Sequence, residues 1–159
     1  MKDLDLTIHY QFATMDELPQ EEQELITAAI QATRNSYANY SHFHVGAALR
    51  LADGSIMIGA NQENAAFPSS LCAERSAIFA AQSQKPEQAI LTLAIAARND
   101  QGMLRQPVTP CGGCRQVIME MEDRYRRPVS ILLYGTEGIC RFQSVKDLLP
   151  FSFVDANMK

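Results

Sequence analysis

The sequence lacks the features that mark membrane, secreted and nucleic-acid-binding proteins. No apolar run comes near the about 20 residues that a membrane-spanning helix needs. The first five residues, Met1 to Asp5, contain none of the apolar stretch of a secretory signal peptide. Lys and Arg number 14 against 18 Asp and Glu, whereas nucleic-acid binding depends on cations that neutralise phosphates. We therefore expect a cytoplasmic protein with no membrane and no polynucleotide partner.

Cysteine is also scarce, with four residues in 159. In a chain of this size without a secretory signal, thiols are more commonly reduced or bound to a metal than paired as disulfides. A chain of this length buries roughly 70% of its unfolded surface without such covalent links. We expect one domain, with no internal repeat and no linker.

Three of the four cysteines belong to two short stretches that carry the strongest chemical signal. The first is Cys-Ala-Glu-Arg at 72–75, and the second is Pro-Cys-Gly-Gly-Cys at 110–114. A catalytic zinc has three protein ligands and keeps its fourth position open. A Cys-x-x-Cys pair alone is a weak indication, because redox dithiols and structural zinc sites share it. Joined to the first stretch, it has the form of the zinc nucleobase deaminase signature, in which a Glu follows the first ligand.

The spacing places both stretches at the N-termini of helices. Residues two apart do not share a face in the body of a helix, so Cys72 and Glu74 can serve one site only from a first turn. Side chains there lean toward the N-terminus, where free amide groups and the helix dipole stabilise thiolates. Apolar residues at helical spacing follow each stretch: Ala73, Ala77, Ile78, Ala80 and Ala81 after the first, and Val117, Ile118, Met121 and Tyr125 after the second. We expect two helix ends that point at one metal.

The remaining patterns predict an α/β protein. Alternation or apolar runs predict strands, helical spacing predicts one more helix, and Asp53-Gly54 predicts the turn of a hairpin. The predicted strands are 4–12, 45–51, 55–60, 89–97, 129–134 and 139–142, the further helix is 21–36, and 145–149 is a final helical turn. The run at 89–97 is almost wholly apolar, as in a central strand that is covered on both faces. These elements predict a three-layer α/β/α fold with a mixed central sheet.

The first 20 residues are predicted to form an N-terminal extension that precedes a domain at 21–159. Within the extension, five apolar residues alternate with polar ones, which is typical of a half-buried strand. The apolar set is Leu4, Leu6, Ile8, Tyr10 and Phe12.

Five stretches, in order along about residues 22 to 153, resemble the small homotetrameric cytidine deaminases. Besides the two cysteine stretches, they are Ser-His-Phe-His-Val-Gly-Ala-Ala-Leu at 41–49, Gly-Ala-Asn-Gln-Glu-Asn-Ala at 59–65 and Leu-Leu-Pro-Phe-Ser-Phe at 148–153. The resemblance implies the cytidine-deaminase fold and one Zn²⁺ per chain. It also implies hydrolysis of cytidine and deoxycytidine to uridine and deoxyuridine with release of ammonia, as in pyrimidine salvage.

The resemblance assigns roles to individual residues. Cys72, Cys111 and Cys114 correspond to the zinc ligands, and Glu74 to the group that carries protons between water, ring N3 and the departing amine. The substrate contacts correspond to Asn61 and Glu63 for the ribose hydroxyls, Phe43 for the pyrimidine face, the Ala73 main chain for the base carbonyl, and Phe153 for the pocket of a neighbouring subunit. Gln62, His42 and His44 depart from the residue types that we expect in the family.

Arg75 is predicted to support the metal ligands. Three thiolates on Zn²⁺ leave a net charge of −1, which weakens the Lewis acidity that a catalytic zinc needs. Charge-assisted hydrogen bonds from Arg75 to the ligand sulfurs, together with the two helix N-termini, would offset this charge.

Three alternatives remain open at the level of sequence. A structural zinc site could take Cys140 as a fourth ligand and would then be closed and inert. A deaminase of another aminopyrimidine nucleoside, such as blasticidin S, would keep the same zinc chemistry. A polynucleotide-editing deaminase would need a basic channel for a single strand, which the acidic composition does not favour.

Overall fold

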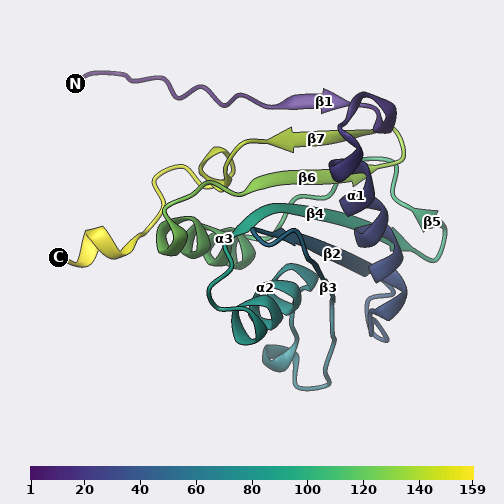
Figure 1. Cartoon of the computed structure of the whole chain (residues 1–159). Coiled ribbons are helices and arrows are strands. Elements are labelled where there is room, and N and C mark those ends of the chain that lie inside the picture. The colour runs from purple at the N-terminus through teal and green to yellow at the C-terminus, as the bar shows by residue number, and fades with distance from the viewer.

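The computed structural model describes all 159 residues and contains one seven-stranded sheet with three long helices (Figure 1). The helices are α1 (Gln20–Ala32), α2 (Ala73–Gln84) and α3 (Gly112–Tyr125). The strands are β1 (Gln11–Ala13), β2 (His44–Leu51), β3 (Ile56–Ala60), β4 (Ile90–Asn99), β5 (Gly102–Met103), β6 (Ser130–Gly135) and β7 (Gly138–Phe142). The strand order is β1-β7-β6-β4-β2-β3, and β5 pairs with β4 alone. No helix has both the length and the hydrophobicity needed to cross a membrane.

The sheet is mixed because a single crossover runs parallel. The β4–β6 pair is parallel and contains α3 in its connection, whereas every other pair is antiparallel. The predicted hairpin is β2–β3, and Gly54 in its turn has a φ of +83°. The predicted three-layer α/β/α fold with a mixed central sheet is confirmed.

Alternate residues of the central strands pack against helices on opposite faces. On one face, α1 buries Leu25, Ile26 and Ala29 against the sheet, whose contributing residues are Ala48, Ala94, Ala96, Leu132 and Ile139. On the other face, α2 and α3 cover residues of the opposite parity, which include Ala47, Leu49, Leu93, Ile95, Ile131 and Leu133. This period of two is the pattern expected of strands that are buried on both faces.

Two glycines allow helices to lie directly on the β2–β3 hairpin. A Cβ atom at Gly46 of β2 would lie 2.1 Å from the carbonyl oxygen of Ala29 in α1. A Cβ atom at Gly59 of β3 would lie 2.4 Å from the amide nitrogen of Ala77 and 2.6 Å from the carbonyl oxygen of Ala73, both in α2. Any side chain at Gly59 would therefore displace the start of α2.

The predicted strand at 4–12 is wrong in extent. Strand β1 includes only Gln11–Ala13, and the apolar side of the segment is exposed rather than half-buried. The reason is the length of the partner strand: Gln11 pairs with Arg141, and β7 ends one residue later at Phe142. Residues before Tyr10 run on beyond the sheet without a strand beside them (Figure 1). The proposed domain boundary after residue 20 stays a prediction.

Candidate active site

The two cysteine stretches occupy the N-termini of α2 and α3, as the spacing predicts. Cys72 is the N-cap of α2, and Cys111 is the N-cap of α3; both have extended backbone, with ψ of 154° and 164°. Glu74 and Cys114 lie in the first turns that follow. The two helix ends meet, so that one carboxylate and three thiols converge at one place on the α2/α3 side of the sheet.

The three sulfur atoms form a group that can hold one metal ion. All three Sγ atoms of Cys72, Cys111 and Cys114 lie within 4.8 Å of one another, and the Cys72 and Cys111 sulfurs are 3.9 Å apart. Sulfurs bound tetrahedrally at about 2.3 Å to one zinc are about 3.8 Å from each other. Cys114 is buried, whereas Cys111 is exposed. The group thus has the donor set and the spacing of a three-cysteine zinc site with one side open.

Cys140 does not belong to this group. It lies in β7, where it packs against the core between the sheet and α2/α3, and no fourth ligand completes the cysteine group. The alternative of a closed four-cysteine site is therefore contradicted.

Charges around the sulfurs favour thiolate at Cys72. The pKa of Cys72 is lowered to about 5, mainly because Cys114 donates a hydrogen bond to it and further because Arg75 does so. The Arg75 Nη2 lies 3.3 Å from the Cys72 sulfur, and this contact raises the pKa of the guanidinium. Glu74 is 5% exposed, and burial raises the pKa of its carboxyl group. Burial therefore favours the protonated form of this carboxyl group beside the thiols.

A short backbone bridge brings Asn61 and Glu63 next to the cysteines. Gln62, between them, exchanges two hydrogen bonds of 2.9 Å with Leu71, the residue before Cys72. A hollow of about 420 Å³ results, and its lining includes Asn61, Glu63, Cys72 and Arg75. The exposed Gln62 side chain donates to the carbonyl oxygens of Asn35 and Ala60, at 3.1 and 3.4 Å, so it braces the bridge from outside.

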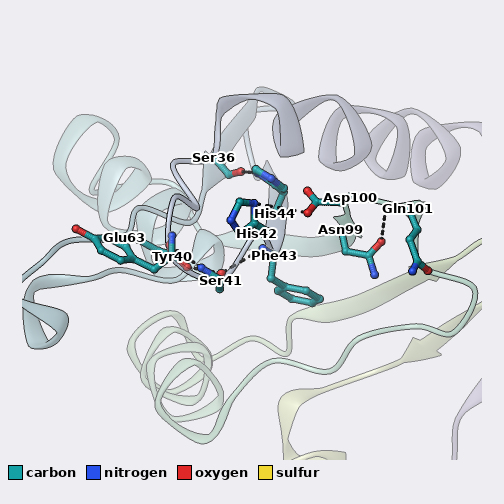
Figure 2. A network of polar contacts seen from close by, with 10 residues as sticks. All are labelled: Ser36, Tyr40, Ser41, His42, Phe43, His44, Glu63, Asn99, Asp100 and Gln101. Carbon is teal, nitrogen blue, oxygen red and sulfur yellow. Dashed lines mark hydrogen bonds and ion pairs between the residues drawn. The ribbon is translucent and has the colours of Figure 1, made fainter.

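Asn61 and Glu63 also hold the loop that precedes β2. Figure 2 shows Glu63 with its partners Tyr40 and Ser41. The Asn61 side chain donates to the Phe43 carbonyl oxygen at 2.9 Å and accepts from the Val45 amide at 2.8 Å. Glu63 accepts hydrogen bonds from the Tyr40 amide at 2.7 Å and from both the amide and the hydroxyl of Ser41. These contacts lower the pKa of Glu63, chiefly through the Ser41 hydroxyl. The two residues thus fix the backbone on both sides of Phe43.

Phe43 and the two histidines beside it, His42 and His44, have different neighbours. The half-buried Phe43 ring points away from the polar network in Figure 2. His44 contacts the Ser36 hydroxyl through Nδ1, and His42, at a φ of 55°, has its Nδ1 3.6 Å from an Asp100 carboxylate oxygen. Neither histidine belongs to a group that could hold a metal.

Phe153 lies outside the hollow, on the chain segment that follows β7. Its side chain is 59% exposed, and its carbonyl oxygen accepts a hydrogen bond of 2.9 Å from Gln116 in α3. Arg115 donates to the carbonyl oxygen of Pro110 at 2.8 Å and to that of Leu148 at 2.6 Å. The end of the chain is therefore fastened to the first turns of α3, close in sequence to Cys114.

Sequence reasoning missed the supporting residues Ser41, Arg115 and Glu122. Buried Glu122 accepts from the amides of Val129 and Val145 at 3.0 and 2.9 Å and from the Ser144 hydroxyl. It joins the C-terminal end of α3 to the segment after β7. No spacing rule connects these positions, although a charged residue inside an apolar helical pattern, as at Glu122, indicates a buried polar contact. A larger hollow of about 590 Å³ lies at that end of α3, away from the thiols, so volume alone does not identify the site.

Comparisons with known proteins agree with this geometry. A model of the cytidine and deoxycytidylate deaminase zinc-binding region matches residues 19–127. A cytidine deaminase of Halalkalibacterium halodurans is 38% identical over 138 residues, which are 87% of this chain and 98% of the relative. The crystal structure of a cytidine deaminase from Burkholderia pseudomallei superposes with a TM-score of 0.71 at 37% identity, over 82% of this chain and 97% of that one. A blasticidin-S deaminase of Bacillus cereus is more distant, at 27% identity over 86% of this chain and 94% of the relative.

The family match includes both cysteine stretches, and the structure brings those stretches together in a fold that solved cytidine deaminases share. The chain belongs to the cytidine and deoxycytidylate deaminase family, whose matched region is zinc-binding.

Proposed function

We propose that this protein hydrolyses cytidine and deoxycytidine to uridine and deoxyuridine, with release of ammonia, at a zinc held by Cys72, Cys111 and Cys114. The observation that carries the proposal is the meeting of three thiols with one buried carboxyl group at two helix N-termini. A closed structural site would have no use for that carboxyl group. Zinc in such a site supplies Lewis acidity, which lowers the pKa of bound water to about 7.

Glu74 moves the protons of the reaction. Its carboxylate accepts one proton from the attacking water and delivers it to ring N3. It then accepts the remaining proton of the hydroxyl group now on C4 and delivers it to the amine as the C4–N bond breaks and the carbonyl forms. Burial supports this role, because it raises the pKa of Glu74 toward the range in which a carboxyl group both accepts and donates. Arg75 stabilises the negative charge of the ligand sulfurs through its hydrogen bond to Cys72.

The nucleoside is held by groups that retain free hydrogen-bonding capacity. Glu63 uses three of its roughly four acceptor positions on the loop, and Asn61 uses one acceptor position and one of two donors. The donor and acceptor positions that remain free on Asn61 and Glu63 bind the ribose hydroxyls in the hollow beside Cys72. Phe43 packs on the pyrimidine, and the main chain of Ala73, at the free N-terminal end of α2, binds the base carbonyl.

The complete site needs a neighbouring subunit. Phe153 and Phe151 are 59% and 98% exposed, and aromatic residues are enriched at protein interfaces. In the proposed homotetramer, Phe153 closes the pocket of an adjacent subunit. The enzyme acts in cytoplasmic pyrimidine salvage, where thiols remain reduced and available to zinc.

The first experiment compares four substrates with one purified protein. Loss of absorbance near the cytidine maximum is followed with cytidine, deoxycytidine, dCMP and blasticidin S, before and after a strong chelator. We expect turnover of the two nucleosides, none of dCMP, and loss of turnover when the metal is removed. Turnover of no compound while one zinc per chain stays bound would contradict the proposal.

A second candidate function is deamination of blasticidin S, and the relative from Bacillus cereus is the observation in its favour. The same assay separates the two functions. Preference for blasticidin S over cytidine would identify this second activity, whereas preference for the nucleosides supports the first.

A further inference from the structure

Most of the apolar side of the N-terminal segment is exposed. Leu4, Leu6, Ile8, Tyr10 and Phe12 are between 44% and 80% exposed, although apolar residues that alternate so regularly normally face a core. Strand β1 is also the last strand of the sheet, so its outer edge is unpaired. Long, exposed apolar edge strands are templates for pairing with another chain.

This apolar side continues a surface that the sheet already forms. The Phe12 ring lies over Gly138 of β7, since a Cβ atom there would be 2.2 Å from the ring. The Tyr10 ring stacks on Phe142, with centroids 5.4 Å apart and planes inclined by 18°. Phe142 itself belongs to the core under α2 and α3. Residues placed beside Tyr10 and Phe12 would therefore extend an existing apolar face.

We propose that residues 2–12 pair antiparallel with the same residues of a second copy of this chain, with Thr7 opposite Thr7. In this register the apolar pairs are Leu4 with Tyr10 and Leu6 with Ile8, while Asp5 faces His9. Cross-strand apolar and aromatic pairs and Thr–Thr pairs each stabilise a sheet. The sheets of the two chains are then linked through the segments that precede β1.

Side-chain parity excludes registers shifted by one residue, and charge excludes a parallel arrangement. A shift by one residue would place the apolar side chains of one chain on the polar face of the other. A parallel arrangement would set Asp3 and Asp5 beside their own copies, and like charges side by side destabilise a sheet. The chosen register has no facing pair of like charges.

The contact differs from the one proposed for Phe153, since it lies on the β1 edge of the sheet. Eleven residues per chain are fewer than the about 20–30 per side of a standard interface, so the strand pair alone is weak. A covalent trap is therefore the appropriate test. It does not depend on catalysis, so its outcome is independent of the proposed reaction.

The test places one cysteine at the centre of the pairing. In the full-length Thr7→Cys variant, mild oxidation is expected to give a disulfide-linked dimer on a non-reducing gel, above the background of the wild-type thiols. Asp3→Cys is the matched control, because Asp3 would lie opposite Gln11, about 27 Å along the strand from its own copy. Asp3→Cys is expected to stay at the wild-type background.

Two further variants test whether the cross-link depends on the apolar pairs. Ile8→Asp in the Thr7→Cys background is expected to abolish the cross-link. Ile58→Asp is the matched control, because Ile58 has nearly the same exposure as Ile8, 46% against 44%, and lies on the opposite edge strand, β3. Equal cross-linking at positions 3 and 7, or no effect of Ile8→Asp, would overturn the proposal. Absence of the cross-link, with binding to phosphatidylcholine vesicles that Ile8→Asp prevents, would assign this side to a lipid surface instead.

Discussion

The two halves of the candidate site are built in different ways. We call Cys72, Cys111 and Cys114 with Glu74 and Arg75 the metal half, and Asn61 and Glu63 with the 40–45 loop the proposed sugar half. The thiols of the metal half converge from two helix N-termini. Asn61 and Glu63 form most of their hydrogen bonds with the loop that carries Phe43. The metal half therefore has its ligands assembled, whereas the residues of the proposed sugar half also support the loop. We expect damage to the first to affect metal and kcat, and damage to the second to affect KM.

The largest expected effect is at Glu74. Glu74→Gln keeps the shape of the side chain but removes the proton acceptor, so kcat is expected to fall by about 10²- to 10⁴-fold. Zinc content should not change, because all three sulfurs remain. Steady-state kinetics and metal analysis measure the two quantities. Glu120→Gln, the same change at an exposed position of α3, is the control; a kcat near that of the wild type with zinc bound would remove Glu74 from the mechanism.

Arg75 tests whether the metal half needs support from outside the ligand set. Arg75→Gln removes the guanidinium that contacts the Cys72 sulfur, and we expect zinc affinity to fall by about 10- to 100-fold. Competition with a chromophoric chelator measures this change. Arg75→Lys restores part of the affinity if the positive charge matters, and Arg127→Gln, at an exposed site, leaves it unchanged. Equal affinity in all the variants would mean that the contact does not support the metal.

The smallest expected effect is at Ser41, in the sugar half. Ser41→Ala removes the hydroxyl group that contributes most to the lowered pKa of Glu63. We expect KM to rise by a few-fold, since one hydrogen bond contributes about 1 kcal/mol, with little change in kcat. Ser69→Ala, at an exposed serine of the 67–69 turn, is the control.

The pH dependence of KM sharpens this prediction. The pKa of Glu63 is lowered in the folded protein, so its carboxylate contacts stabilise the loop fully above the ordinary pKa of 4.5. This stabilisation is lost as the pH falls through the lowered pKa, where the carboxylate becomes protonated. Without Ser41 the pKa of Glu63 returns toward the ordinary value. As pH is lowered, KM of Ser41→Ala should therefore begin to rise at a higher pH than KM of the wild type. Superimposable KM profiles would show that Glu63 does not act through this loop.

The sequence predicts the metal half well because its determinants are local. A first-turn position explains why Cys72 and Glu74 converge although they are only two residues apart. Apolar periodicity likewise predicts the central strands and the helices, and Asp53-Gly54 predicts the hairpin. Each of these features depends on residues that are neighbours along the chain.

The remainder could not be predicted because it depends on contacts without periodicity. The hydrogen bonds between Glu63 and Ser41 join residues 22 apart through an irregular loop. At the N-terminus, alternation indicates that residues 4–12 suit a sheet, but it does not show that β7 ends at Phe142 and leaves most of them without a neighbour in the chain. A local pattern indicates that a segment suits a strand, but whether a partner strand lies beside it depends on the rest of the fold.

The position of the metal ligands depends on Gly59, although Gly59 is not one of them. Its missing side chain lets α2 rest on β3, and this contact sets the depth at which Cys72 and Glu74 meet the sulfurs of α3. The residue touches no ligand, and it lies in a hairpin strand rather than in either cysteine stretch. For enzyme engineering, a substitution at Gly59 is therefore expected to disturb the metal site from outside it, and β3 should be left as it is.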